Sequence, residues 1–271
     1  MSIWTYSDVS HEPHYVWSGN TCTFCQTEMK LLHRQIDNIS TLKSTGSHEK
    51  RLFVCPVCGW WKADGQQEID AWVHHTGFST IEGAAASLRE LDLTDISTPI
   101  QEVRSYLAVK YEQRFTMHPR LFEETIASVF RDLGYEAEAT AYSGDDGIDV
   151  ILKRGEETIG VQAKRYKAAI EVDQIRSLAG ALLLNGMTRG MFVTTSGFQS
   201  GATRTTEKYQ TRGYKIELAD AKRFYEALKI AQRNMYASLK EFPIADVLNR
   251  MVKIEEYVDD TRHSGLKFEP F

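Results

Sequence analysis

Apolar and polar positions alternate differently in the two halves of this 271-residue chain. A helix is predicted from about residue 98, with Thr98 as its N-cap and a capping-box spacing after it. A second amphipathic helix is predicted from Pro119, with Gly134 in the position of a C-terminal stop. The first 76 residues have few helical repeats and are rich in Trp, His and Cys.

After Gly134 the period of the pattern changes to that of strands. From residue 119 the predicted order is α-β-β-β-α-β-α-β-α, with a hairpin turn through Arg154-Gly155. Three consecutive strands followed by helix crossovers predict a mixed β-sheet flanked by helices, which is an α/β fold.

The sequence pattern predicts less regular structure for the first part of the chain. The segment RLFVCPVCGWW indicates a strand that enters a tight turn, and IDNISTLKSTGSHEK indicates a loop or hairpin connection. A short helix is expected around Ala84–Leu91, within a linker. The predicted domains are 1–76, a linker with a connecting helix at 77–117, a core at 118–232, and a helical extension at 233–271.

The cysteines fall into two Cys-x2-Cys pairs that are separated by 29 residues. Two matched pairs are typical of a structural zinc ribbon, so a small N-terminal domain that binds Zn²⁺ is predicted. Its ligands would be Cys22, Cys25, Cys55 and Cys58. A redox pair is the alternative, and the histidines that could compete as ligands are expected at the surface: His33, His48, His74 and His75. Trp60 and Trp61 are expected to pack the small domain rather than to offer a stacking surface.

Composition narrows the class of protein. No apolar run approaches the roughly 18–20 residues of a membrane span, and the N-terminus lacks the pattern of a secretory signal, so a cytoplasmic location without a membrane anchor is expected. Net charge is −5, but residues 151–215 contain eleven basic and five acidic side chains. That stretch is compatible with phosphate binding, and solvated helix faces are the alternative.

One pair of segments carries the arrangement of a phosphodiesterase site. SGDDGIDV precedes VQAKRY, with twelve residues between Asp149 and Gln162, so a hairpin would bring the two strands side by side. Period-two alternation then puts Gln162 and Lys164 on one face of their strand. Oxygen ligands suit Mg²⁺, which polarises a phosphoryl group and activates water, and a lysine stabilises the developing charge.

Four blocks in order resemble the Mrr-like restriction endonuclease domain over about residues 118–230: HPRLFEETIASVFRDLGY, SGDDGIDV, VQAKRYK and GMFVTTSGF. This resemblance implies a restriction-endonuclease-like catalytic domain at 118–232. It implies Asp149 as the metal-binding carboxylate, Gln162 in the position of the second acidic ligand, and Lys164 as the catalytic lysine. Glu123 matches the helix glutamate of the family and could make a further metal-site contact.

Each candidate also has a structural explanation. Asp149 could close a turn, Gln162 and Lys164 could form an exposed strand face, and a glutamate at position 123 could serve the helix dipole. Asp145 and Asp146 are expected to shape their loop. Hydroxyls at the end of the next strand could hold phosphate, although helix capping by Ser196 is the expected role.

The resulting hypothesis is a Mg²⁺-dependent DNA endonuclease in restriction or anti-phage defence, with the zinc domain as a targeting or assembly module. DNA is the expected partner. A homo-oligomer is expected because one active site cuts one strand, and a protein partner could bind the N-terminal domain. The alternatives are a non-catalytic nucleic-acid-binding protein of the same fold, and a nuclease for branched DNA or RNA.

Overall fold

The computed structural model describes residues 3–7, 9, 19–72, 76–140, 147–235 and 242–260, and the chain forms two compact units. The terminal unit comprises Met1–Arg89 and Leu239–Phe271, and the central unit comprises Glu90–Ser238. The domain boundaries expected at residues 76, 117 and 232 each fall inside one of these units. No helix among the described residues is long and apolar enough to cross a membrane.

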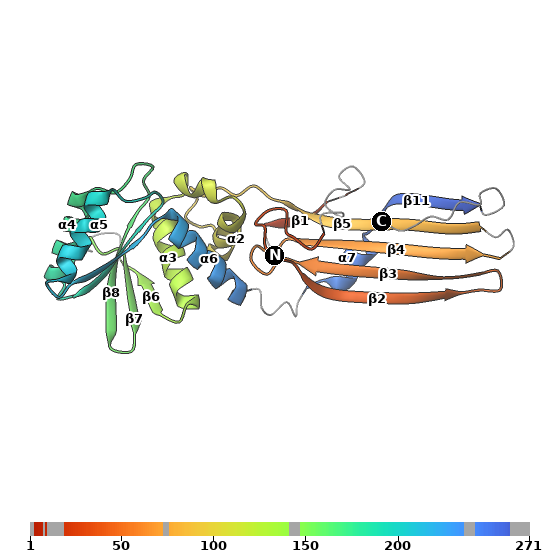
Figure 1. The fold of residues 1–271 in the computed structure, drawn as a ribbon, viewed down its shortest axis with the longest axis horizontal. Coiled ribbons are helices and arrows are strands. Elements are labelled where there is room, and N and C mark those ends of the chain that lie inside the picture. The colour runs from red at the N-terminus through yellow and green to blue at the C-terminus, as the bar shows by residue number, and fades with distance from the viewer. Residues whose placement is uncertain are drawn as a thin grey trace. The chain divides into compact units, whose positions relative to one another are not determined.

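The terminal unit is built on a six-stranded sheet in the order β1-β5-β4-β3-β2, with β11 paired to β5 as well (Figure 1). Every pairing in this sheet is antiparallel. A short helix, α7 (Ile244–Asn249), contacts β3. The strands are β1 (Trp4–Ser7), β2 (Lys30–Ser40), β3 (Ser44–Val54), β4 (Trp61–Ala71), β5 (Thr76–Leu88) and β11 (Val252–Asp260). The predicted hairpin connection is confirmed as the β2–β3 hairpin.

The helix expected at Ala84–Leu91 is wrong, because β5 runs through this segment to Leu88. Ala84, Ala85 and Ala86 are buried, and Ala84 pairs with Ala63 of β4. Alanine favours helices in isolation, but burial and pairing with neighbouring strands override so weak a preference.

Aromatic side chains fill the interior of the terminal unit near the cysteines. Trp60 is fully buried, and its indole N–H donates to the Ala86 carbonyl at 2.8 Å. The Trp4 indole N–H donates to the Cys58 carbonyl at 2.7 Å. The Phe24 ring contacts Trp4 and Trp60 with centroid distances of 5.0 and 5.5 Å. The expectation that Trp60 packs the domain is confirmed.

The central unit has the predicted order of helices and strands from residue 119 onward. Its elements are α2 (Ile100–Val109), the 3-10 helix η1 (Tyr111–Phe115), α3 (Pro119–Asp132), β6 (Glu136–Ala139), β7 (Val150–Arg154), β8 (Glu157–Lys164), α4 (Val172–Leu184), β9 (Arg189–Thr194), α5 (Ser200–Gln210), β10 (Lys215–Ala219) and α6 (Ala221–Met235). The sheet order is β10-β9-β8-β7-β6. Strands β6, β7 and β8 pair antiparallel, whereas β8, β9 and β10 pair parallel, so the mixed sheet is confirmed.

Helices cover both faces of this sheet, with α4 and α5 on one side and α3 and α6 on the other (Figure 1). Gly160 of β8 pairs with Gly190 of β9, and Leu182 of α4 lies directly over both. A Cβ atom on either glycine would lie 2.8 or 2.5 Å from a methyl carbon of Leu182. These glycines therefore let α4 approach the sheet closely.

The helices before the sheet differ partly from the prediction. Helix α2 begins at Ile100 after Pro99 and has no side-chain cap, since the Thr98 hydroxyl donates to the Asp92 carbonyl instead. Helix α3 begins at Pro119 as predicted, and His118 caps it by accepting from the Arg120 N–H at 3.1 Å.

The last part of the chain is only partly helical. The extension expected at 233–271 contains the end of α6, the short helix α7 and then β11, which is a strand. Strand β11 was missed because its segment alternates weakly, with acidic residues at 255 and 256. Pairing with β5 supplies the order that the local pattern does not predict.

Candidate nuclease site and cysteine cluster

Asp149 lies directly before β7, at the end of that strand where it pairs with β8. Val150 pairs with Val161, and the Asp149 N–H donates to the Val161 carbonyl at 2.8 Å. The Ala163 N–H donates to Oδ2 of Asp149 at 2.6 Å. The carboxylate is therefore tied to β8, between Gln162 and Lys164 in the sequence of that strand.

Gln162 is 5% exposed, and its Oε1 has no hydrogen-bond partner among the described residues. A buried amide oxygen without a partner costs about 1–3 kcal/mol. Gly147 has a φ of +86°, and a Cβ atom there would lie 3.4 Å from Nε2 of Gln162. The chain thus reaches Asp149 through a backbone conformation that glycine permits, close beside the Gln162 amide.

Lys164 ends β8, two residues after Gln162 and therefore on the same face of the strand. Its carbonyl accepts from the Thr194 hydroxyl at 3.0 Å and from the Thr195 N–H at 3.2 Å. The Thr195 hydroxyl donates to the Tyr166 carbonyl at 2.9 Å. Both hydroxyls therefore hold the end of β8, rather than standing ready for a phosphate.

The expected capping role of Ser196 is wrong. Its hydroxyl donates to the Ala168 carbonyl at 2.7 Å, and α5 begins later, at Ser200, with Gln199 as its N-cap. This hydrogen bond can form because the parallel bridge between Ile170 and Phe198 brings residues 168 and 196 close together.

Glu123 lies on α3, which packs against β6, β7 and β8. It is the fifth helical residue, beyond the first turn, so a favourable contact with the helix dipole explains it less well than the sequence suggested. Arg120 lies 3.3 Å from Oε2 of Glu123. Asp145 and Asp146 fall outside the described residues.

The donor set at this site suits a hard divalent cation. Asp149 supplies a carboxylate, and the buried Oε1 of Gln162 supplies an amide oxygen whose hydrogen-bonding capacity is unused within the described structure. Mg²⁺ takes oxygen ligands and commonly keeps several waters, so two protein oxygens are enough to begin a site.

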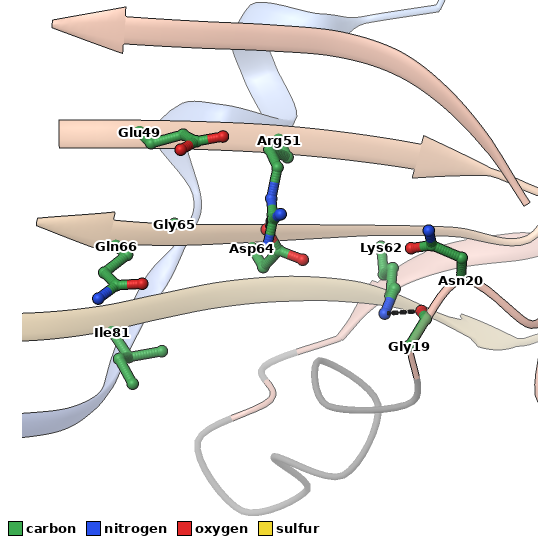
Figure 2. A pocket seen from close by; sticks show the side chains of 9 residues that line it. All are labelled: Gly19, Asn20, Glu49, Arg51, Lys62, Asp64, Gly65, Gln66 and Ile81. Atoms are coloured by element: carbon green, nitrogen blue, oxygen red, sulfur yellow. Dashed lines mark hydrogen bonds and ion pairs between the residues drawn. The ribbon is translucent and has the colours of Figure 1, made fainter. Parts of the chain in front are cut away.

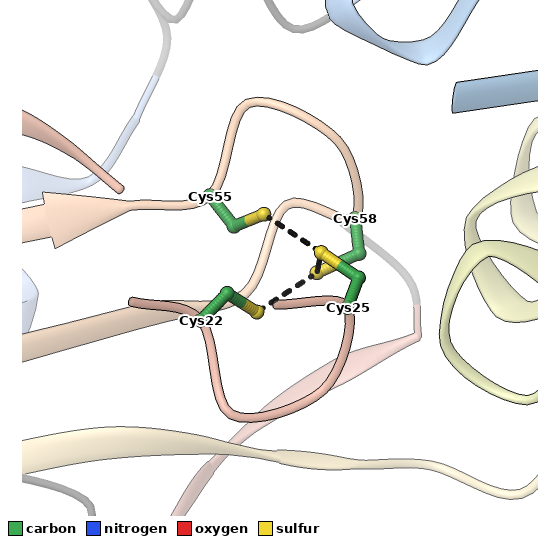
Figure 3. A group of neighbouring side chains, drawn as sticks. All are labelled: Cys22, Cys25, Cys55 and Cys58. Atoms are coloured by element: carbon green, nitrogen blue, oxygen red, sulfur yellow. Dashed lines mark hydrogen bonds between the residues drawn. The ribbon is translucent and has the colours of Figure 1, made fainter. Parts of the chain in front are cut away.

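The four cysteines form a second cluster, in the terminal unit (Figure 3). All four sulfur atoms lie within 4.8 Å of one another. The Sγ–Sγ distances are 3.6 Å for Cys22–Cys58, 3.3 Å for Cys25–Cys55 and 3.8 Å for Cys25–Cys58. Four thiolates at the usual Zn–S distance of about 2.3 Å lie about 3.8 Å apart in a tetrahedron. The cluster therefore fits one zinc ion.

The two cysteine turns have the same backbone design. In the first, the Gln26 N–H donates to the Cys22 carbonyl at 3.0 Å, and in the second the Gly59 N–H donates to the Cys55 carbonyl at 3.0 Å. Gln26 and Gly59 both have positive φ, at 58° and 77°. This repeated geometry turns both thiols of each pair toward one point.

The four thiols converge on one point and three of them are buried, which argues against the redox alternative. Hydrogen bonds from Cys22, Cys55 and Cys58 hold the pKa of the Cys25 thiol well below its usual range, whereas burial raises the pKa of the Cys58 thiol. Buried thiolates need a cation to compensate them. Among the described residues no histidine joins this group; His33 and His48 lie on β2 and β3, and His74 and His75 are not described.

A separate cavity of about 280 Å³ lies over the strands of the terminal unit (Figure 2). Its one buried cation is Lys62, which donates to the Gly19 carbonyl at 2.5 Å and whose pKa is lowered by burial. Arg51 is paired with Asp64 at 2.7 Å. Two basic and two acidic side chains line this cavity: Arg51, Lys62, Glu49 and Asp64.

The comparisons with known proteins concern the segment that contains Asp149, Gln162 and Lys164. Residues 115–228 match the restriction endonuclease family Mrr_cat. The matched segment begins at the last residue of η1, ends within α6 and includes Glu123. It covers less than half of the chain and leaves the cysteine cluster outside.

One relative is the type IV methyl-directed restriction enzyme EcoKMrr of Escherichia coli (strain K12), which is 33% identical over 112 residues. The aligned segment is 38% of this chain and only 37% of that protein. A solved structure, the MspJI restriction endonuclease in complex with a 27-mer oligonucleotide, aligns with 60% of this chain and 39% of its own. That alignment has 20% identity and a TM-score of 0.33.

Arg120 is a residue of the site region that the sequence did not single out. The spacing of three residues to Glu123 on a helix could have signalled one of its contacts. Its bond to the Thr140 carbonyl joins segments 20 residues apart, and no local pattern reports it.

Proposed function

We propose that this protein is a metal-dependent endonuclease that hydrolyses phosphodiester bonds in DNA. The observation that carries the proposal is the buried Gln162 Oε1, without a described partner, on the strand whose Ala163 N–H holds the Asp149 carboxylate, within a segment that matches the restriction endonuclease family. An acid and an orphaned oxygen next to a lysine are poorly explained by stability alone, because the oxygen is costly to bury.

Asp149 and Gln162 would hold Mg²⁺, with Glu123 making a further contact to the metal site. The bound cation would polarise the phosphoryl group and lower the pKa of a water. Lys164 contributes a fixed positive charge toward the non-bridging oxygens, where negative charge increases during hydrolysis. Asp149 is held by the Ala163 N–H, so its carboxylate is preorganised for this role.

DNA in restriction or anti-phage defence is the proposed substrate, in the cytoplasm. The relative named above is described as a methyl-directed restriction enzyme, although the match covers 37% of it. The domain also exposes basic side chains on α5, including Arg204 and Lys208, which suit contacts with phosphates. A homo-oligomer is part of the proposal, because two active sites are needed to cut both strands.

The cysteine cluster would hold one structural Zn²⁺ through four thiolates. The terminal unit that it stabilises would then target the nuclease to a DNA feature or to a partner protein.

Plasmid cleavage tests the proposed activity. Purified full-length protein should nick or linearise supercoiled plasmid with Mg²⁺, and excess EDTA should stop the reaction. Asp149→Ala serves as the inactive control. Binding without cleavage at any divalent metal would favour the non-catalytic alternative, and preferential cleavage of a four-way junction or of RNA would favour the other nuclease substrates.

A further inference from the structure

Arg120 occupies a junction between α3 and the strand that leads toward Asp149. Its Nη1 donates to the Thr140 carbonyl at 2.6 Å and lies 3.3 Å from Oε2 of Glu123. Its Nη2 donates to Oε1 of Glu124 at 2.6 Å. The side chain is 23% exposed, so these contacts are made in a partly desolvated position.

Thr140 extends this connection to Asp149. Its N–H donates to the Asp149 carbonyl at 3.0 Å. Its hydroxyl lies 2.8 Å from the Ile148 carbonyl and 3.1 Å from the Asp149 carbonyl. Arg120 is therefore one residue removed from the backbone that carries the candidate metal ligand.

The contacts of Arg120 differ in what they can accomplish. Those with Glu123 and Glu124 follow the i,i+3 and i,i+4 spacing of an ordinary helix surface, where such pairs add only about 0.2–0.5 kcal/mol. The bond to Thr140 instead joins the helix to the residue that follows β6. One rigid guanidinium thus fixes a carboxylate on α3 and the strand end beside Asp149 at the same time.

We propose that Arg120 is a positioning residue, which holds Glu123 and the Asp149 strand in one arrangement for metal binding. This inference rests on the proposed nuclease function. Arg120 acts through Glu123 and through the Thr140 backbone, and it contacts neither the metal nor the DNA. Residues that orient metal ligands typically change metal affinity or activity by about 10–100-fold when they are removed.

The test compares Arg120→Ala, Arg120→Lys and Glu124→Gln in the full-length protein. Glu124→Gln is the matched control, because it removes the Nη2 ion pair and leaves the contacts of Nη1 with Glu123 and Thr140. Binding of Mn²⁺ without DNA, measured by electron paramagnetic resonance, gives a readout that does not depend on cleavage. The Mg²⁺ concentration for half-maximal plasmid cleavage gives the second readout.

Arg120→Ala should weaken Mn²⁺ binding and raise the Mg²⁺ requirement by about tenfold or more. Glu124→Gln should stay within about twofold of wild type, as expected for the loss of one i,i+4 ion pair on a helix. Arg120→Lys should fall between them, since a single ammonium cannot reproduce the planar set of donors. If Arg120→Ala does not fold, Arg120→Lys carries the same test.

An unchanged Mn²⁺ affinity in folded Arg120→Ala, or in Arg120→Lys where alanine does not fold, would overturn the inference. An equal loss in Glu124→Gln would also overturn it, because the effect would then come from helix stability. These results leave the nuclease proposal intact as long as wild type cleaves and Asp149→Ala does not. A wild-type protein that neither cleaves nor binds metal better than Asp149→Ala would instead refute the proposed function.

Discussion

The two sheets of this protein bury their strands in different ways. In the terminal unit, β4 is buried at its first residues next to the cysteine turn and alternates between exposed and half-buried residues toward its far end. In the central unit, β8 is buried through most of its length, because helices cover both faces of the sheet.

This difference separates two sources of stability. Burial in the terminal unit is concentrated where the four thiols and the Trp60 ring meet, so a single bound ion can decide whether the sheet forms. Burial in the central unit is spread over a continuous apolar core of helix and strand residues. That core can support a polar site at the strand ends, including an oxygen as costly as Oε1 of Gln162.

Loss of one cysteine should have the largest effect. Cys55→Ser removes a buried ligand, and structural zinc contributes on the order of 10 kcal/mol to the folding of such sites. Zinc content should fall to near zero, and amide hydrogen exchange should become fast in β3 and β4 while β8 and β9 stay protected. Ser47→Ala, on β3 and eight residues before Cys55, is the control. Retained zinc with slow exchange in β4 would show that the terminal sheet does not depend on the ion.

Removal of the candidate catalytic groups should come next. Asp149→Ala and Lys164→Ala should each lower the cleavage rate by at least about 10²–10³-fold, because each removes stabilisation of developing charge. DNA binding, measured by fluorescence anisotropy, should persist, since phosphate contacts from other basic side chains remain. Lys153→Ala removes an exposed charge on β7 and should cleave normally. Rapid cleavage by Asp149→Ala would place the site elsewhere.

Separation of the two units should change selectivity more than rate. A truncated protein of residues 90–238 contains all of α2 and the segment 115–228 that matches the restriction endonuclease family. It should cut modified, unmodified and nicked DNA with similar rates, whereas the full-length protein should discriminate among them. Equal discrimination by both proteins would contradict a targeting role for the terminal unit.

The smallest effect is expected at the edge of the central sheet. A hydrogen bond from Lys215, together with Arg223 and Arg189, lowers the pKa of Glu217 on β10. Its contribution to stability is therefore present above the pKa of the unfolded state and is lost as pH falls through the lower pKa of the folded state. Glu217→Gln should cost up to about 1 kcal/mol at pH 7 and progressively less in acid. Urea unfolding at pH 7 and at acidic pH measures this loss of stability, with Glu226→Gln as the control.

Sequence periodicity predicted the central unit well because each of its elements is locally consistent. Helices and strands follow one another from Pro119 in the predicted order. Arg154 ends β7, and Gly155 opens the turn of the β7–β8 hairpin. The assignments of Asp149, Gln162 and Lys164 depend on that hairpin, and their roles stay predictions. The sequence did not predict that Oε1 of Gln162 lacks a described hydrogen-bond partner, and it did not predict the contacts of Arg120. Both depend on three-dimensional packing.

The terminal unit was harder to predict for a physical reason. The cysteine spacing identified the cluster, because two pairs of thiols at a fixed spacing have few other uses. The alanine-rich part of β5 favours a helix locally and becomes a strand only between its neighbours. Strand β11 pairs with the earlier part of β5, Thr76–Gly83, and is separated from β5 by 163 intervening residues, so no local window could include both strands.

The position of β11 in the chain also affects the order of events during synthesis. Bacterial and eukaryotic ribosomes add about 5–20 residues per second, so β11 emerges roughly 8–30 s after β5. During that interval the backbone of β5 that β11 later covers, Thr76–Gly83, has no partner on that side from within the described chain. The nascent protein thus presents an open strand edge, which another chain could pair with, while its central unit is completed.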